Sequence, residues 1–346
     1  MTVSRLSLAL DDGAALPPSG GIVVIGATAD TDLSAFPKDR LTVVQGFRPD
    51  HDRLAAKGFE VRVATTGSFA GAVICLPRSR DEARALVAEA AGCVEPGGPI
   101  WLDGQKTDGI DAMLRDVRSR AALSAPVAKA HGKCAMFRCE GPAAFTDWVT
   151  RDTRPAPGFT ARPGCFSADG IDPGSQVLAD ALPAGLKGRG ADLGAGWGWL
   201  AAQVLRQPGV TELHLVEAQH MAVEAARANI SDPRAVFHWA AATGFRPDRP
   251  LDFIVMNPPF HRGRTGDPGL GMAFIRAAAK LLHASGALWL VANRHLPYEE
   301  TLQAWFLQVE EMPGTGAFKV FRASRPLTTP RDIARGKPQS RARRGH

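Results

Sequence analysis

The sequence predicts an α/β protein with two tandem Rossmann-like domains, the first of them degenerate. The strongest observation is the run Phe253-Ile254-Val255-Met256, which is continuously apolar, as in strands buried on both faces of a parallel sheet. This run breaks abruptly into a Pro-rich turn. A similar rhythm of apolar strands and helices occupies the N-terminal half, which indicates a second α/β domain.

In the N-terminal half, three apolar segments predict strands, at residues 22–25, 61–64 and 72–76, and a helix follows over residues 81–91. The segment CVEPGGPIWLDG (93–104) resembles LLHASGALWLVA (281–292). Two residue types coincide at one constant offset, with Gly98 opposite Gly286 and Trp101 opposite Trp289. We interpret the two halves as a duplicated domain.

Proline and charge patterns predict the domain boundaries. Three prolines interrupt the periodicity of RDTRPAPGFTARPG, so residues 151–164 are expected to form a linker. The first domain is then 1–150 and the second 165–330. Residues 331–346 carry six basic residues against one acid, with few apolar residues, and are expected to form a disordered basic tail that can engage phosphates. A purely solubilising tail is the alternative.

A glycine loop follows a strand candidate in the second domain. ADLGAGWGWL (191–200) contains G-x-G-x-G at Gly194, Gly196 and Gly198, which lets the backbone turn tightly against a ligand, and a helix is expected over 200–205. A dinucleotide fingerprint needs glycine where this chain has Trp199. Asp192 begins the loop and is placed to meet an ammonium group, which S-adenosylmethionine carries.

A second strand candidate, 212–217, ends in Glu217. This acid lies about 20 residues beyond the glycine turn, the distance at which an acid meets ribose hydroxyls in nucleoside-binding βαβ units. A strand-end Glu by itself is usually solvated or capping. Asp192, the glycines, Glu217 and Asn257 follow one another along the chain in the order that such a binding site requires. This order favours a contact of Glu217 with ribose hydroxyls.

Asn257-Pro258-Pro259-Phe260 follows the buried strand and is typical of an amino-group methylation site. The prolines restrict the turn to extended conformations. If the Asn257 side-chain oxygen and the Pro258 carbonyl each accept one hydrogen of an exocyclic amine, the nitrogen lone pair is directed at an incoming methyl group. Phe260 would stack on the base. The tetrapeptide alone is equally compatible with an ordinary Pro-rich turn.

These motifs together resemble class I S-adenosylmethionine-dependent methyltransferases, specifically the RsmC-like ribosomal RNA guanine-N2 methyltransferases. The resemblance covers most of residues 160–325 and includes GCFSADGIDPGSQVLADALP, ADLGAGWGWLA, HLVEAQ, MNPPFHRG, ALWLVANRHLPYE and FKVFRASR. It implies a base pocket at Asn257, Pro258, Pro259 and Phe260. It also implies cofactor contacts at Asp192, Gly194, Ala195, Gly196, Glu217 and Asn257, and a closing segment at Phe166 and Ser167.

One departure concerns the adenine of the cofactor. Family members commonly carry an acid after the third strand, whereas this chain reads Ala240-Ala241-Ala242 after FHWA. Adenine would then be held by the backbone of Trp239 and Ala240 and by apolar contacts.

The first domain lacks both diagnostic loops. Ile25 is followed by Gly26-Ala27-Thr28-Ala29, and Cys75 is followed by Leu76-Pro77-Arg78-Ser79 where the second copy is expected to have Asn257–Phe260. This domain should therefore bind no cofactor and should instead brace its neighbour and widen the RNA-binding surface. Six of its basic residues are candidate phosphate contacts, although ordinary solvated charges are the simpler interpretation: Arg78, Arg80, Lys106, Arg115, Arg118 and Arg120.

Composition predicts a cytoplasmic enzyme without membrane or metal, and a monomer is expected. No apolar run reaches the roughly 20 residues that span a bilayer, and the N-terminus lacks a signal-peptide pattern. The five cysteines are scattered, without a second ligand pair for a metal, and the net charge is +6. The expected partner is ribosomal RNA or a ribosomal subunit.

Three functions remain open from the sequence. The first is methyl transfer from S-adenosylmethionine to guanine N2 in ribosomal RNA, on the small subunit. The second is methylation of DNA adenine or of a protein glutamine, which could use the same Asn-Pro-Pro geometry. The third is a noncatalytic RNA-binding assembly factor, which the intact glycine loop and the Asn-Pro-Pro turn disfavour.

Overall fold

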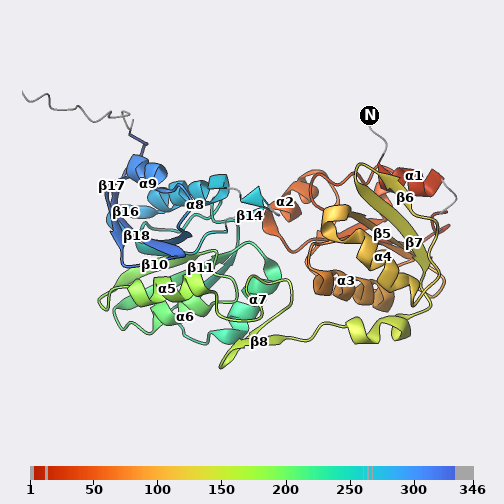
Figure 1. Ribbon diagram of the computed structural model, residues 1–346, viewed down its shortest axis with the longest axis horizontal. Helices are drawn as coiled ribbons and strands as arrows, with labels where there is room; N and C mark the ends of the chain where they lie inside the picture. The colour runs from red at the N-terminus through yellow and green to blue at the C-terminus, as the bar shows by residue number, and fades with distance from the viewer. Residues whose placement is uncertain (1–3, 12–14, 260, 263–264, 267, 332–346) are drawn as a thin grey trace, which may run out of the picture. The chain divides into compact units, whose positions relative to one another are not determined.

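The computed structural model describes residues 4–11, 15–259, 261–262, 265–266 and 268–331. The chain contains two seven-stranded sheets, and each sheet with the helices that follow its strands forms one unit (Figure 1). This arrangement confirms the predicted α/β class with two tandem Rossmann-like domains. The expected basic tail lies outside the described residues, apart from Arg331.

The first sheet has the strand order β3-β2-β1-β4-β5-β7-β6. Its first five strands in that order run parallel, while β7 is antiparallel to both β5 and β6. The strands are β1 (Ile22–Ile25), β2 (Leu41–Val44), β3 (Glu60–Arg62), β4 (Gly71–Cys75), β5 (Pro99–Gln105), β6 (Val127–Lys129) and β7 (Gly132–Arg138).

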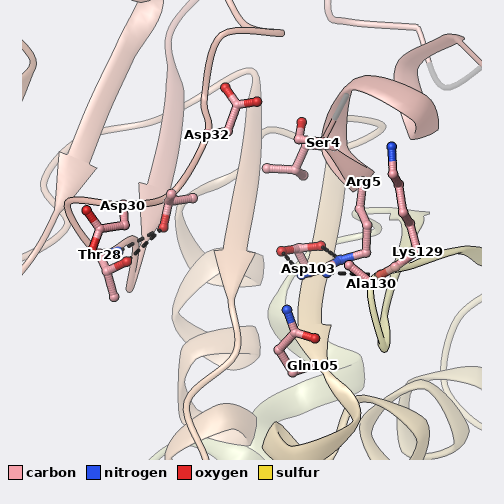
Figure 2. Close-up of a pocket in the computed structure, with 11 residues that line it drawn as sticks. Ser4, Arg5, Thr28, Asp30, Asp32, Asp103, Gln105, Lys129 and Ala130 are labelled. Carbon is pink, nitrogen blue, oxygen red and sulfur yellow. Dashed lines mark hydrogen bonds and ion pairs between the residues drawn. The ribbon is translucent and has the colours of Figure 1, made fainter. Parts of the chain in front are cut away.

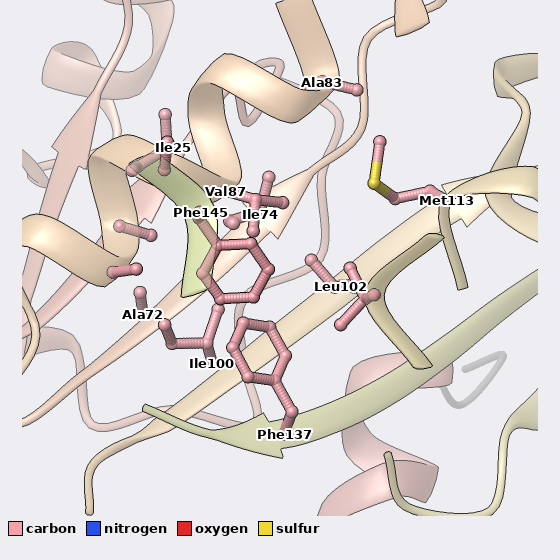
Figure 3. Close-up of a cluster of buried hydrophobic side chains, with 14 of the residues drawn as sticks. Ile25, Ala72, Ile74, Ala83, Val87, Ile100, Leu102, Met113, Phe137 and Phe145 are labelled. Carbon is pink, nitrogen blue, oxygen red and sulfur yellow. The ribbon is translucent and has the colours of Figure 1, made fainter. Parts of the chain in front are cut away.

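Helices cover both faces of this sheet. Successive residues of a strand point to opposite faces, so each buried strand contributes apolar side chains to both layers of helices. Val23 and Ile25 pack in one apolar cluster with α3 and α4, and Ile22 and Val24 pack in the other with α1 and α2. Figure 3 shows the first cluster, in which Phe137 and Phe145 meet at 5.6 Å between ring centroids. The helices are α1 (Arg5–Asp11), α2 (Arg48–Ala56), α3 (Arg80–Cys93) and α4 (Ile110–Arg118), with 3-10 turns at Lys38–Arg40, Lys106–Asp108 and Pro142–Trp148.

The second sheet repeats this topology, with the order β12-β11-β10-β13-β16-β18-β17. Here β18 is antiparallel to β16 and β17, as β7 is to β5 and β6 in the first sheet. The strands are β10 (Gly188–Leu193), β11 (Val210–Glu217), β12 (Ala235–Trp239), β13 (Leu251–Met256), β16 (Leu282–Asn293), β17 (Phe306–Met312) and β18 (Phe318–Pro326).

Five helices accompany the second sheet in the described part of the chain. Figure 1 shows α8 and α9 on one face of this sheet and α5 and α6 on the other. The helices are α5 (Pro173–Ala181), α6 (Trp199–Leu205), α7 (His220–Asn229), α8 (Pro268–Leu281) and α9 (Glu299–Trp305). The two short strands β14 (His261–Arg262) and β15 (Thr265–Gly266) pair after β13.

The predicted strands and helices occur, but several elements were not predicted and the expected linker contains regular structure. The strand Leu41–Val44 was not predicted, although it is four consecutive apolar or β-branched residues and is buried throughout. The expected linker, 151–164, contains an antiparallel hairpin of β8 (Thr153–Ala156) and β9 (Phe159–Ala161). Asn229 fixes this hairpin, because its amide accepts from Thr160 N at 2.8 Å and donates to Thr160 O at 2.8 Å.

Strand register places the duplicated tryptophans at the same point of each sheet. In the first sheet, Trp101 lies opposite Val73, which lies opposite Val24. In the second, Trp289 lies opposite Val255, which lies opposite Asp192. The two rows are therefore equivalent, and they allow residues of the two units to be matched one by one.

Among the described residues, no helix combines the length and apolarity that a bilayer crossing requires.

Candidate active site

Three neighbouring parallel strands of the second sheet bring the predicted residues to one edge. The strands β11, β10 and β13 are adjacent in the sheet. Glu217 ends β11, Asp192 is the penultimate residue of β10, and Asn257 directly follows β13. In open α/β sheets, ligands bind at the carboxyl ends of such strands.

Asp192 is a buried carboxylate, with 1% of its surface exposed. The loop after it is held against β11, because Gly194 N donates to Val216 O at 2.8 Å and Ala195 N donates to the same oxygen at 3.2 Å. Gly194 has φ +83°, a left-handed conformation that residues with a side chain rarely adopt. The sequence therefore needs glycine here to turn the chain from the strand into α6.

Glu217 is half-buried, and one of its oxygens is already engaged. Glu217 Oε1 accepts a hydrogen bond from Gln219 N at 2.8 Å, so the side chain is folded over the turn into α7. A carboxylate has two oxygens that accept hydrogen bonds. This contact therefore orients the Glu217 carboxylate over the turn into α7.

The dipeptide Trp239-Ala240 lies beside Glu217. Ala240 N donates to Glu217 O at 2.9 Å, and Trp239 Nε1 donates to Ala218 O at 2.8 Å. The indole also meets the ring of His220 edge-on, at 5.1 Å between centroids. The Ala240 N–H is thus already paired within the protein.

Asn257 is tied to the start of α5. Its Nδ2 donates to Asp172 Oδ1 at 2.6 Å and to Ser175 Oγ at 2.9 Å. Asp172 is the N-cap of α5 and also accepts from Ser175 N at 2.8 Å. Neither partner was predicted from the sequence. Asp172-Pro173 was a readable helix-start signal, but nothing local connects it to a residue 85 positions away.

The rest of the Asn-Pro-Pro-Phe turn is only partly described. Pro258 is buried and Pro259 is exposed. Phe260, the expected stacking residue, lies outside the described residues. The part of the base pocket that the structure describes is therefore Asn257 to Pro259.

The predicted closing segment, Phe166 and Ser167, directly follows the buried Cys165. Burial raises the pKa of the Cys165 thiol to about 11, and the Glu217 carboxylate is close enough to add to the shift. The next residue, Phe166, is 57% exposed. Ser167 adopts φ +52°, and its hydroxyl donates to Gly170 O at 2.7 Å. This left-handed serine turns the chain immediately after the exposed phenyl ring.

Strand register matches residues of the first sheet with residues of the second sheet. One of these matches differs from the prediction made from the sequence. The tryptophan rows match Ile74 with Met256, so Cys75 is the counterpart of Asn257. The expectation that Leu76 takes this place was wrong by one residue, because the end of β4 was not fixed by its apolar pattern. In the same way Val24 matches Asp192, Gly26 matches Gly194 and Gln45 matches Glu217.

The Gln45 side chain is hydrogen-bonded to the loop that follows the neighbouring strand, β1. Its Nε2 donates to Ala27 O at 2.7 Å, and its Oε1 accepts from Phe47 N at 2.7 Å. The second contact repeats that of Glu217 with Gln219, two residues ahead. The first contact is new, because an amide nitrogen donates where a carboxylate could only accept. Gln45 thus joins the loop to the strand instead of presenting an acceptor.

A pocket of about 380 Å³ lies at the carboxyl edge of the first sheet (Figure 2). One wall is the ion pair of Arg5 with Asp103, at 2.7 Å between Nε and Oδ1. The opposite wall is the loop after β1, including Thr28 and Asp30. Counting from the matched glycines, these two residues replace Gly196 and Gly198, so side chains stand where the second unit has none.

Three of the six candidate phosphate contacts in the first unit are paired with acids. Arg78 lies 3.6 Å from Asp108, Arg80 lies 2.8 Å from Asp116, and Arg120 lies 2.6 Å from Asp147. Local neutralisation of this kind fits ordinary solvated charges better than a dedicated phosphate surface.

Comparison with known proteins gives consistent results. The family profile of the Methyltransferase small domain matches residues 157–322. Ribosomal RNA small subunit methyltransferase C of Escherichia coli K12 is 31% identical over 254 residues, which cover 71% of this chain and 73% of that protein. The same protein of Shigella flexneri serotype 5b matches equally.

A solved structure matches almost the whole chain. It is the T. thermophilus 16S rRNA N2 G1207 methyltransferase (RsmC) in complex with AdoMet and guanosine. The TM-score is 0.77 at 24% identity, and the match covers 93% of this chain and 92% of that one. Both units are therefore included in the likeness of fold. From its sequence identity and coverage, the chain belongs to the ribosomal RNA small subunit methyltransferase C family.

Proposed function

We propose that this protein transfers a methyl group from S-adenosylmethionine to the exocyclic N2 of a guanine in ribosomal RNA of the small subunit. The observation that carries the proposal is the setting of Asn257 at the end of β13, next to the strand of Asp192. This order of strand ends puts an amine acceptor beside an acid and a glycine loop. The family relationship supports ribosomal RNA as the substrate.

The chain's own residues would act by position and polarity. An aromatic amine is a weak nucleophile, because its lone pair is delocalised into the ring. Asn257 Oδ1 and the Pro258 carbonyl would each accept one amine hydrogen, which turns the lone pair towards the methyl carbon. Proline has no N–H, so no donor of its own competes beside that carbonyl. The methylated amine then loses a proton to water.

The cofactor site would be formed by Asp192, the Gly194–Gly198 loop, Glu217 and the Trp239-Ala240 dipeptide. S-adenosylmethionine supplies a methyl group on a positively charged sulfur, which leaves as a neutral thioether. The residues fit this molecule, because the buried Asp192 carboxylate suits an ammonium group and the left-handed Gly194 allows close backbone approach. Phe166 would close over the site.

Each part of the chain has its own role in this proposal, and only one domain is catalytic. We assign residues 1–150 to a domain without a cofactor site, 151–164 to a connecting segment, 165–330 to the catalytic domain and 331–346 to a basic tail that contacts RNA. The protein would act as a cytoplasmic monomer on ribosomal RNA or a ribosomal subunit, without a metal.

The test is transfer of tritiated methyl groups to small ribosomal subunits from a strain that lacks the enzyme. Digestion of the RNA to nucleosides should then give radioactive N2-methylguanosine. Parallel reactions with DNA and with a glutamine-containing protein separate the alternative amine substrates. Radioactivity in N6-methyladenosine or in protein would move the assignment to those substrates. Binding to subunits without any transfer would favour the noncatalytic assembly factor.

A further inference from the structure

In the described part of the chain, the Asn257 amide nitrogen is held by the start of α5. Both hydrogens of its Nδ2 are engaged by α5, one by Asp172 Oδ1 at 2.6 Å and one by Ser175 Oγ at 2.9 Å. These three residues belong to the same compact unit. A primary amide has two donor hydrogens, so the donor capacity of Asn257 is used in full.

The Asp172 carboxylate determines which way the amide faces. An ionised carboxylate only accepts hydrogen bonds, so it selects the nitrogen side of Asn257 and disfavours the flipped amide. The Asn257 oxygen then lies on the side of the amide away from α5. Ser175 alone could not select the orientation, because a hydroxyl both donates and accepts.

We propose that Asp172 is a positioning residue that holds the Asn257 oxygen towards the substrate amine, with Ser175 as its second support. This inference rests on the proposed function, since it assigns a substrate role to the Asn257 oxygen. A flipped amide would present hydrogens to an amine that itself donates, and productive geometry would be lost. Asp172 contacts the reacting nitrogen only through Asn257.

The first unit provides an internal comparison. There the helix before the first strand, α1, is capped by Ser4, which accepts from Ser7 N at 3.1 Å. The same spacing in α5 has Asp172 accepting from Ser175 N. The first unit has Cys75 in place of Asn257 and so has no amide to orient. Its cap is a serine, which suffices for a helix end.

The experiment exchanges the cap while keeping the helix. Asp172→Ser copies the first unit and retains a favourable N-cap, but its shorter side chain withdraws from Asn257. Asp172→Asn is the matched variant, because the same Oδ1 accepts from Ser175 N and from Asn257 Nδ2, so the backbone N–H would hold an amide oxygen at this place. Ser79→Ala removes the N-cap of a different helix, α3, where Ser79 accepts from Glu82 N, and controls for general loss of stability.

We expect Asp172→Ser to lower kcat about 10- to 100-fold, with little change in KM for subunits or Kd for S-adenosylmethionine. Asp172→Asn and Ser79→Ala should retain kcat within about threefold of the parent, because neither frees the Asn257 amide. Melting temperatures of all variants are measured alongside, so that a loss of kcat is compared only among folded proteins.

Two results would overturn the inference. One is an Asp172→Ser enzyme with the parent kcat, and the other is an equal loss in Asp172→Asn, which would indicate a need for charge instead of amide orientation. Either result leaves methylation by the parent protein intact. Failure of the parent protein itself to form N2-methylguanosine would instead refute the proposed function.

Discussion

The two units of this chain share one strand order but differ in the residues at the carboxyl ends of their strands. Asp192, Glu217 and Asn257 in the second sheet correspond to Val24, Gln45 and Cys75 in the first. The glycine that starts the loop is present in both, as Gly194 and Gly26, with φ +83° and +78°. The fold therefore depends on the glycine, and the proposed chemistry depends on the residues around it.

Each difference removes a specific interaction. Val24 is fully buried and apolar where Asp192 has a carboxyl group. The Gln45 amide nitrogen donates to Ala27 O in the loop after β1, whereas a carboxylate such as that of Glu217 has no hydrogen to donate. Burial raises the pKa of the Cys75 thiol to about 12, so this side chain stays neutral at the position of an amine acceptor. The first unit thus keeps the strand order and core of the fold, while its strand ends carry different residues from those that we assign to the cofactor and base sites.

The largest effect is expected from Asn257→Ala. Removal of the amine acceptor should lower kcat roughly 100- to 1000-fold, in the range seen when one preorganised hydrogen-bonding group is lost from an active site. Cofactor affinity, measured by calorimetry, should be nearly unchanged. The matched control is Cys75→Ala, which alters the equivalent place in the first unit and should leave kcat unaffected. Unimpaired turnover by Asn257→Ala would remove this residue from the mechanism.

Replacement of Glu217 tests the cofactor site. Glu217→Gln copies the first unit, and Glu217→Ala removes both acceptors for the ribose hydroxyls. Each hydrogen bond to a charged group contributes about 1.5–3 kcal/mol, so Kd for S-adenosylmethionine should rise roughly 10- to 100-fold in the alanine variant and less in the glutamine variant. Gln45→Ala should not change Kd. Parent-like binding by Glu217→Ala would show that the ribose is held elsewhere.

The two matched glycines should differ in their tolerance of alanine. A Cβ on Gly194 would lie 3.6 Å from the Phe274 ring, an ordinary contact, so the change should cost about 1–2 kcal/mol from its left-handed backbone alone. A Cβ on Gly26 would lie 2.7 Å from Cys75 O, and this backbone atom must move. Urea unfolding should therefore show Gly26→Ala to be the less stable variant. Equal stabilities would contradict the close packing of this loop in the first unit.

The smallest effect concerns pH. Burial lowers the pKa of His214. His214 matches Thr42 of the first sheet. Its Nδ1 lies 2.8 Å from His238 Nε2. The folded state therefore binds a proton less readily than the unfolded state. Stability should be full above the unfolded pKa of about 6.5 and should decline as pH falls below it. His214→Thr should weaken this decline in urea titrations between pH 7 and 5, whereas an unchanged decline would assign it to other groups.

Much of the site was readable from the sequence, because its signals are local. The Asn257-Pro258-Pro259 turn follows a continuous apolar strand, and the glycine spacing at Gly194 is set by backbone sterics. The order of Asp192, Glu217 and Asn257 along the chain was enough to predict three strand ends at one edge of a sheet. The repeated Gly-Pro-Ile-Trp and Gly-Ala-Leu-Trp segments likewise predicted the duplication.

Tertiary structure decided what depends on distant residues. Apolar patterning fixed the existence of β4 but not its end, so register was needed to match Cys75 with Asn257. The capping role of Asp172 follows from its own neighbours, whereas its contact with Asn257 exists only because α5 packs beside the end of β13. Hydrogen bonds act over about 3 Å, and sequence alone does not tell which remote side chains come within that distance.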